Sequence, residues 1–152
     1  MNALRLIQEG IHNLPDIMTH YENAIRDYKV NLELNGKTIE RANKEQTGWL
    51  SYYDELRIEM KSVLNYVEIE VEKIKGVKWR KYKEHFSIEL STRDLDQYIY
   101  SDPEYVEMRQ VFCEVEQLYN KVNSVVECFR ARAYSLKNIT DLRIHSLSDV
   151  VL

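Results

Sequence analysis

The sequence predicts an all-α, oligomeric protein whose main feature is a long helical hairpin with coiled-coil-like heptads. Only four glycines and two prolines occur among its 152 residues, so few turns interrupt the chain. Apolar residues recur at intervals of three and four over two long stretches, which is the period of amphipathic helices. The second stripe is wider than a two-helix seam requires, which indicates contacts with other copies of the chain.

The N-terminal residues 1–29 are expected to form a helical extension of a single domain, whose main part covers residues 30–152. Apolar residues within 2–12 are spaced for a short amphipathic helix, which should be broken near Pro15. A second helix is predicted over residues 16–29.

Residues 30–39 change character and predict a small extended arm. Three apolar residues alternate with polar ones between Val30 and Leu34, and Asn35-Gly36 is a common hairpin-turn pair. Because a lone hairpin is marginal in water, the segment should either stay extended or dock on another surface as a strand.

From about Thr38 the pattern predicts the first long helix. Its seam consists of Trp49, Tyr53, Leu56, Met60, Val63, Val67, Val71 and Ile74. Residues 67–72 alternate strictly and, in isolation, would suit a strand, but the preceding turns of helical period favour the helix. Gly76 is expected to loosen or end it.

The connection of residues 84–102 is expected to contain a short helix. Ser91, with Asp94 three residues later, resembles a capping box at its start. Asp102-Pro103-Glu104 then marks the start of the second long helix, because these residues suit the N-cap, the first helical position and the first turn.

The second long helix carries an apolar stripe from Met108 to Phe129, accompanied by a second row at intervals of seven. One partner helix covers only part of such a stripe, so the remainder should contact other copies of the chain. The residues predicted for oligomerisation are Val115, Leu118, Val122, Val125, Phe129, Leu136, Ile139 and Leu142.

Residues 73–83, at the expected turn between the long helices, are strongly basic in a chain of net charge −4. Cations neutralise phosphates and flat rings stack on unpaired bases, so this mixture predicts a site for single-stranded nucleic acid. The predicted DNA-binding residues are Lys73, Lys75, Lys78, Trp79, Arg80, Lys81, Tyr82 and Lys83. Two other interpretations stay open: a lysine-rich helix face that only contacts solvent, and a Trp79 that belongs to the core of the hairpin.

A second, smaller basic group follows residue 123 and consists of Arg130, Arg132, Lys137 and Arg143. The tail of residues 146–152 is expected to fray or to be buried in a subunit contact. Cys113 and Cys128 lie about 22 Å apart along one helix, too far to form a disulfide, and are expected to be reduced core residues.

No group of residues in the sequence indicates catalysis. The four histidines, His12, His20, His85 and His145, lack neighbouring ligands at metal-site spacing, and no phosphate-binding glycine motif occurs. We therefore expect no enzyme activity, cofactor or metal. The sequence shows no membrane-length apolar run and no signal peptide, which predicts an intracellular protein without membrane association.

Three segments carry a family resemblance: RAYSLKNITDLR from Arg132 to Arg143, YSDPEY at residues 100–105, and Lys78-Trp79-Arg80 followed by Tyr82. Over roughly residues 32–146 the chain resembles the UvsY family of recombination mediators from T-even-type phages. The first segment is similar to a pattern near the C-terminus of that family, and the second is similar to the start of the family's C-terminal helix. The third falls where the family has a DNA-binding motif, although the glycine-bearing turn that follows this motif is absent.

The resemblance implies a homo-oligomeric ring, hexamer- or heptamer-like, that binds single-stranded DNA. Members of the family help to displace the single-strand DNA-binding protein and load a RecA-like recombinase, which would place this protein in the host cytoplasm. Two alternatives of other classes remain: a helical scaffold without a nucleic-acid role, and a basic segment that binds an anionic membrane or an acidic partner.

Overall fold

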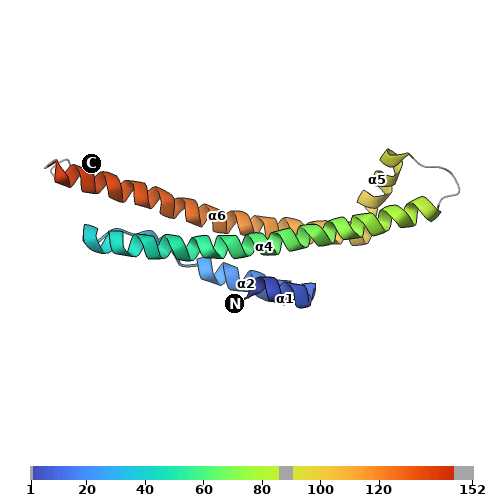
Figure 1. Ribbon diagram of the computed structural model, residues 1–152, viewed down its shortest axis with the longest axis horizontal. Helices are drawn as coiled ribbons and strands as arrows, with labels where there is room; N and C mark the ends of the chain where they lie inside the picture. Colours follow the sequence, from blue (N-terminus) through green and yellow to red (C-terminus); the bar gives the residue numbers. More distant parts are fainter. Residues whose placement is uncertain (1, 86–90, 146–152) are drawn as a thin grey trace.

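A computed structural model describes residues 2–85 and 91–145, and nearly all of this part of the chain is helical (Figure 1). The elements are α1 (Ala3–Glu9), the 3-10 helix η1 (Ile11–Asn13), α2 (Leu14–Ile25), α3 (Tyr28–Leu32), α4 (Ile39–His85), α5 (Thr92–Ser101) and α6 (Pro103–Ile144). The predicted all-α class is confirmed for the described residues, which contain no strand.

Two long antiparallel helices, α4 and α6, form the body of an elongated molecule (Figure 1). The short helix α5 stands at the end where α4 finishes, and the N-terminal helices α1 and α2 pack against the middle of the pair. At the opposite end, α6 reaches past the start of α4. The predicted helical hairpin with a short connecting helix is therefore present.

Six of the eight residues predicted for the seam of α4 are buried, and Trp49 and Ile74 are half-buried. All buried positions of α4 follow in steps of mostly three and four: Ala42, Gln46, Tyr53, Leu56, Met60, Val63, Leu64, Val67, Val71 and Lys78. Gly76 neither loosens nor ends the helix, which runs on to His85. A Cβ atom at Gly76 would meet open space, so the glycine marks an exposed position within the helix.

The predicted caps of α5 and α6 are confirmed. Ser91 Oγ accepts a hydrogen bond from the backbone N–H of Asp94 at 3.3 Å, which caps α5. Asp102 Oδ1 accepts one from the backbone N–H of Glu104 at 3.0 Å, and Pro103 occupies the first position of α6.

The N-terminal helices share one hydrophobic core with α4 and α6. Two separate N-terminal helices are present, as predicted, with the interruption at Gly10 and η1 and with Pro15 in the first turn of α2. Buried residues of α1 and α2, namely Ala3, Ile7, Leu14, Ile17 and Tyr21, belong to the same core cluster as the seam residues of α4 and α6. Each large side chain buried there contributes about 1.5–3 kcal/mol, so this third layer is integral to the fold.

This third layer corrects the prediction for oligomerisation. Within the single chain the structure buries Val115, Leu118, Val122, Val125, Phe129 and Leu136, so these residues are not available for contacts between copies. The width of the α6 stripe is explained by the two neighbours that cover it, α4 on one side and the N-terminal helices on the other. Only Ile139, 37% exposed, and Leu142, 43% exposed, remain at the surface.

The extended arm expected over residues 30–39 is wrong. The short helix α3 includes Val30 and Leu32, and Tyr28 and Leu32, four residues apart, pack against the core. The turn that was expected at Asn35-Gly36 does occur: Gly36 has φ of 71°, and the N–H of Lys37 donates to the carbonyl of Leu34 at 3.1 Å. This turn leads from α3 into α4.

Near the start of α4, the basic residue Arg132 is buried and not part of a basic surface. Its guanidinium donates to Gln46 Oε1 at 2.6 Å and to the carbonyl oxygen of Leu32 at 3.0 Å, while Gln46 Nε2 donates to the carbonyl of Phe129 at 2.7 Å. The Nη2 atom of Arg132 is buried without a hydrogen-bond partner. Burial lowers the pKa of Arg132, although nearby Glu45 opposes this effect.

Both cysteines, Cys113 and Cys128, are exposed and free, which corrects their assignment to the core. The apolar tail of residues 146–152 lies outside the described residues.

Candidate nucleic-acid interface

The basic segment of residues 73–83 forms the last three turns of α4 and is not a turn between two helices. Its side chains therefore point in different directions around one helix. Lys78 and Tyr82 face the α5–α6 junction, where both contact Asp102, and the other side chains lie on outer sides of the helix. The structure thus separates the eight predicted residues by environment.

Lys78 is buried, with 9% of its surface exposed, and its positive charge is paired with acidic side chains of the same protein. Its ammonium group lies 3.0 Å from Asp102 Oδ1 and 2.6 Å from Glu104 Oε2. Tyr82 donates its hydroxyl proton to Asp102 Oδ2 at 2.7 Å. Because Lys78 already has two carboxylate partners, its assignment to DNA binding is corrected: it fixes the start of α6 against α4.

The pKa shifts of this cluster follow from its hydrogen bonds. Glu104 and then Asp102 raise the pKa of Lys78, because both stabilise its charged form. Burial disfavours the charged form of Asp102, but the hydrogen bond from Tyr82 and the contact with Lys78 outweigh it and lower its pKa. The hydrogen bond to Asp102 is also the main cause of the raised pKa of Tyr82.

We expect Lys78→Ala to destabilise the protein by about 2 kcal/mol, because it leaves the buried carboxylate of Asp102 without its cation. The protein is only a few helices thick here, so nearby solvent keeps the loss below that of a deeply buried pair. Urea unfolding measures it, with the exposed Lys81→Ala as the matched control, expected within about 0.5 kcal/mol of wild type. Equal stability of the Lys78 variant and wild type would contradict this role.

The same cluster makes stability depend on pH. Since folding lowers the pKa of Asp102, its carboxylate adds stability above the unfolded value of about 3.9. That contribution is lost as the pH falls through the lower folded pKa. In Lys78→Ala protein this part of the acid dependence should shrink.

A row of cations and rings lies on one outer side of α4. Lys75, Trp79 and Lys83 follow each other at intervals of four, so they share a helix face about 12 Å long. The ammonium of Lys83 lies 4.6 Å from the centre of the Trp79 ring. Trp79 is half-buried and is absent from the hydrophobic core cluster, so the interpretation of Trp79 as a core residue of the hairpin is not supported.

Two tyrosines from α5 and α6 continue this row. The ammonium of Lys75 lies 5.5 Å from the ring centre of Tyr100, which is 52% exposed, and the rings of Tyr100 and Tyr105 lie 5.7 Å apart. Both tyrosines line a hollow of about 450 Å³ together with Arg109. We call Lys75, Trp79, Lys83, Tyr100, Tyr105 and Arg109 the cationic–aromatic row.

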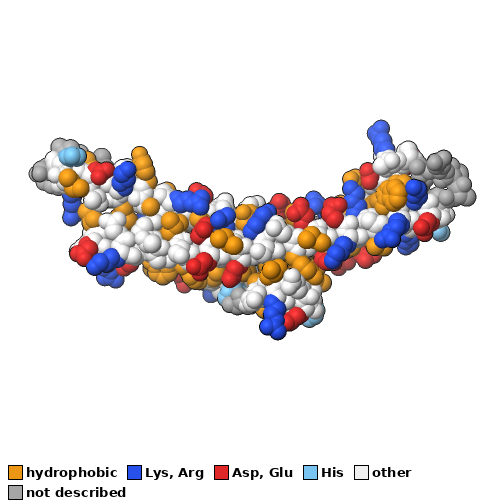
Figure 2. All heavy atoms as spheres, in the orientation of Figure 1, with side chains coloured by type: hydrophobic (Ala, Val, Ile, Leu, Met, Phe, Trp, Pro, Cys, Tyr) orange, Lys and Arg blue, Asp and Glu red, His pale blue; other side chains and the backbone are white. Residues whose placement is uncertain are grey.

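Sequence reasoning did not single out Tyr100, Tyr105 and Arg109. The signal for them is the group of tyrosines on both sides of the Asp102 cap, where the chain turns back towards α4. In the sequence this group of tyrosines indicates only the start of a helix. At this end of the molecule, basic and hydrophobic or aromatic side chains lie side by side (Figure 2).

The remaining predicted residues lie elsewhere around α4. Arg80 and Lys81 are exposed and line a shallow hollow of about 540 Å³ with Val77. Lys73 is exposed and its ammonium lies 2.5 Å from Glu70 on the same helix. The ring of Tyr82 lies 5.9 Å from that of Tyr98, so its face is partly occupied.

Comparisons of the chain with models of protein families, with curated proteins and with solved structures gave no match. Within residues 2–85 and 91–145, no helix is long and apolar enough to cross a bilayer. In the same part of the chain, no three histidine, cysteine or acidic side chains lie close enough to hold a metal ion.

Proposed function

We propose that this protein is a recombination mediator, which binds single-stranded DNA and loads a RecA-like recombinase by displacing the single-strand DNA-binding protein. The resemblance to the UvsY family supports this function, although Trp79 is the one residue of the similar DNA-binding motif that lies in the row, because Lys78 is paired with Asp102 and Glu104. The observation that carries it is the cationic–aromatic row, in which lysines lie beside the half-buried indole of Trp79 and two tyrosines.

The chemistry of the row suits unpaired strands. Lys75, Lys83 and Arg109 supply charges for phosphates, and Trp79 and Tyr100 supply ring faces for bases. Each stacked base contributes about 1–3 kcal/mol whatever its identity, while a duplex keeps its base faces covered. Each phosphate contact should add about −0.7 to the slope of log K against log salt for a single strand.

The proposal also includes a homo-oligomeric ring, in which many weak sites act together on one strand. The surface best placed for contacts between copies is the end of α6 that projects beyond α4 (Figure 1). Here Ile139, Leu142 and Ile144 are exposed.

We expect Ile139→Asp with Leu142→Asp to reduce the mass of the assembly, because two carboxylates would be buried in an apolar contact. Light scattering coupled to size-exclusion chromatography measures the mass. The control is Ile58→Asp with Ile69→Asp, which places the same charges on exposed positions of α4. A protein that is monomeric before mutation, or an assembly unchanged by the α6 pair, would contradict this contact.

The function is tested with a labelled oligo(dT) strand and a labelled duplex of equal length, each titrated with the protein by fluorescence anisotropy. We expect tighter binding of the single strand, and release of single-strand DNA-binding protein from a coated strand as the protein is added. Equal affinity for both DNAs would contradict stacking on the row, and binding without release would contradict the mediator role.

A further inference from the structure

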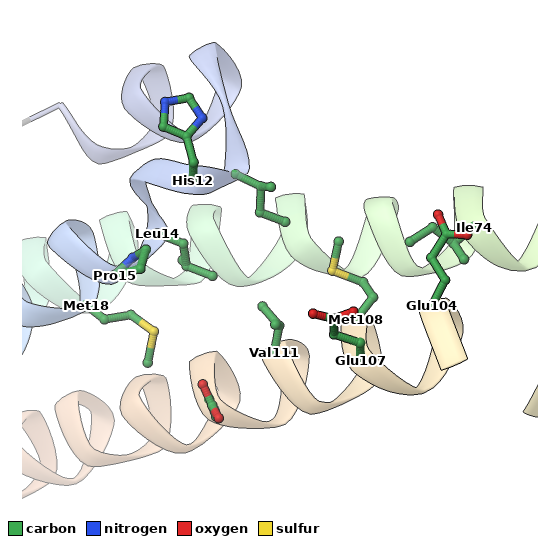
Figure 3. A pocket seen from close by; sticks show the side chains of 11 residues that line it. His12, Leu14, Pro15, Met18, Ile74, Glu104, Glu107, Met108 and Val111 are labelled. Atoms are coloured by element: carbon green, nitrogen blue, oxygen red, sulfur yellow. The ribbon is translucent and has the colours of Figure 1, made fainter. Parts of the chain in front are cut away.

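A second surface is an apolar groove beside the N-terminal helices (Figure 3), which shares Glu114 with the hollow at Tyr100, Tyr105 and Arg109. It has a volume of about 470 Å³. Leu14 and Met18 approach it from α2, Met108 and Val111 from α6 on the opposite side, and α4 lies behind it.

Among the Asp, Glu, Lys and Arg side chains that the structure describes, the groove is lined by glutamates alone. Glu104, Glu107 and Glu114 line it, and no lysine or arginine does. Lys78 already neutralises Glu104 at 2.6 Å. Within the described part of the chain, Glu107 and Glu114 have neither a hydrogen bond nor an ion pair, so their charges face the groove environment uncompensated.

The groove also lies at the edge of the layer formed by the N-terminal helices. The N-terminal helices cover only the middle of the α4–α6 pair, and both long helices continue past them towards α5 (Figure 1). The acidic residues from Glu104 to Glu114 span about 15 Å of α6, the length of about three helical turns. One further helix in this position would extend the third layer along the same two supports.

We propose that this groove binds an amphipathic helix of a partner protein, whose apolar stripe is flanked by lysine or arginine. The apolar lining accepts side chains at helical spacing, as in other grooves that bind helices. Uncompensated Glu107 and Glu114 select cationic flanks. Met18 and Met108 are half-buried, and their flexible side chains can adapt to the shape of the docked residues.

The proposal is tested with a labelled synthetic peptide of about five helical turns, with leucines at helical spacing and lysines beside them. A second peptide carries glutamate in place of each lysine. We expect the full-length protein to bind the basic peptide at least about tenfold more tightly than the acidic one in fluorescence anisotropy.

Charge reversal in the groove identifies the site. Glu107→Lys with Glu114→Lys should weaken binding of the basic peptide by about tenfold or more. The matched control is Glu68→Lys with Glu116→Lys, which makes the same change of net charge at exposed positions outside the groove. The control variant should bind the basic peptide with an affinity within about twofold of that of wild type. An equal loss in both variants would show attraction to overall charge and would overturn the proposal.

Methionine methyl groups give a second readout, independent of the variants. Met18 and Met108 line the groove, whereas Met60 is fully buried in the core. With ¹³C-labelled methionine methyl groups, the basic peptide should shift the signals of Met18 and Met108 and leave that of Met60 in place. Shifts that spare Met18 and Met108 would place the peptide elsewhere and contradict the proposal.

Two further outcomes would also overturn it. The first is no binding of the basic peptide up to a concentration of about 1 mM. The second is no peptide binding together with a self-association that Glu107→Lys with Glu114→Lys abolishes, since a second copy of the chain would then occupy the groove. Neither result depends on DNA binding, so the proposed function is tested separately.

Discussion

Replacing Lys75, Trp79 and Lys83 together with alanine should weaken binding of single-stranded DNA by about a hundredfold or more near 0.1 M salt. Each lost phosphate contact removes about 0.7 log units of affinity at this salt concentration, because fewer counterions are released. Loss of the indole removes a stacked base worth about 1–3 kcal/mol. The slope of log K against log salt should also become shallower by about 1.4.

A control variant distinguishes binding at the cationic–aromatic row from attraction to the overall charge of the protein. A Lys44→Ala and Lys121→Ala pair makes the same change of net charge at exposed positions far from the row. This pair should leave both affinity and slope close to wild type. If the control weakens binding as much as the row variant, the contact is diffuse and the assigned site is wrong. Circular dichroism must show equal helicity in both, as expected for residues outside the core cluster.

Gln46→Leu should cost about 3 kcal/mol of stability, the largest loss that we expect from one substitution. It removes the closest acceptor of Arg132 and the donor to the carbonyl of Phe129 at once. A buried cation that already has one unpartnered nitrogen then loses a hydrogen bond that water cannot replace.

Arg132→Met should cost less than Gln46→Leu, although it removes the larger polar group. Methionine has similar length and carries no charge, so the penalty for burying a cation disappears with the cation. The exposed Gln117→Leu is the control, expected within about 0.5 kcal/mol of wild type in urea unfolding. A higher cost for Arg132→Met than for Gln46→Leu would show that the arginine itself, and not its satisfied network, stabilises this end.

The long helices and their caps were predictable because their signals are local. Apolar spacing and the Asp102-Pro103-Glu104 start depend on residues within a few turns of one another, and the structure confirms both. The prediction of an extended arm over residues 30–39 failed because it, too, used only local signals. The alternation from Val30 to Leu34 is short, and the helical pair Tyr28 and Leu32 outweighs it by packing on a core that local sequence does not reveal.

The prediction of the oligomerisation residues was wrong for most of them, because side chains distant in the sequence cover the apolar stripe of α6. Phe129 stacks on Tyr53 of α4, and α1 and α2 belong to the same core cluster as Val115. Nothing near either residue in the sequence indicates these neighbours, so the prediction assigned to other copies a surface that the same chain covers.

The sequence indicated the basic segment of α4 as the candidate site, but not how the fold divides its side chains among different environments. Lys78 lies seven residues after Val71, in phase with the buried seam, so its position predicts burial while its residue type suggested a phosphate contact. Tyr100, Tyr105 and Arg109 meet the row only because α5 and α6 turn back towards α4. The sequence places them up to about thirty residues away from it.

Fluorescence of Trp79 tests the central claim most directly. The chain has two tryptophans, so Trp49→Phe leaves Trp79 as the only one, and excitation at the red edge of the absorption band avoids emission from the eleven tyrosines. Titration of this variant with oligo(dT) at low salt should quench its emission, because a base stacks on the indole, and added salt should restore it. Saturating DNA that leaves the emission unchanged, or no DNA binding in dilute buffer, would contradict the proposal that the cationic–aromatic row holds a single strand.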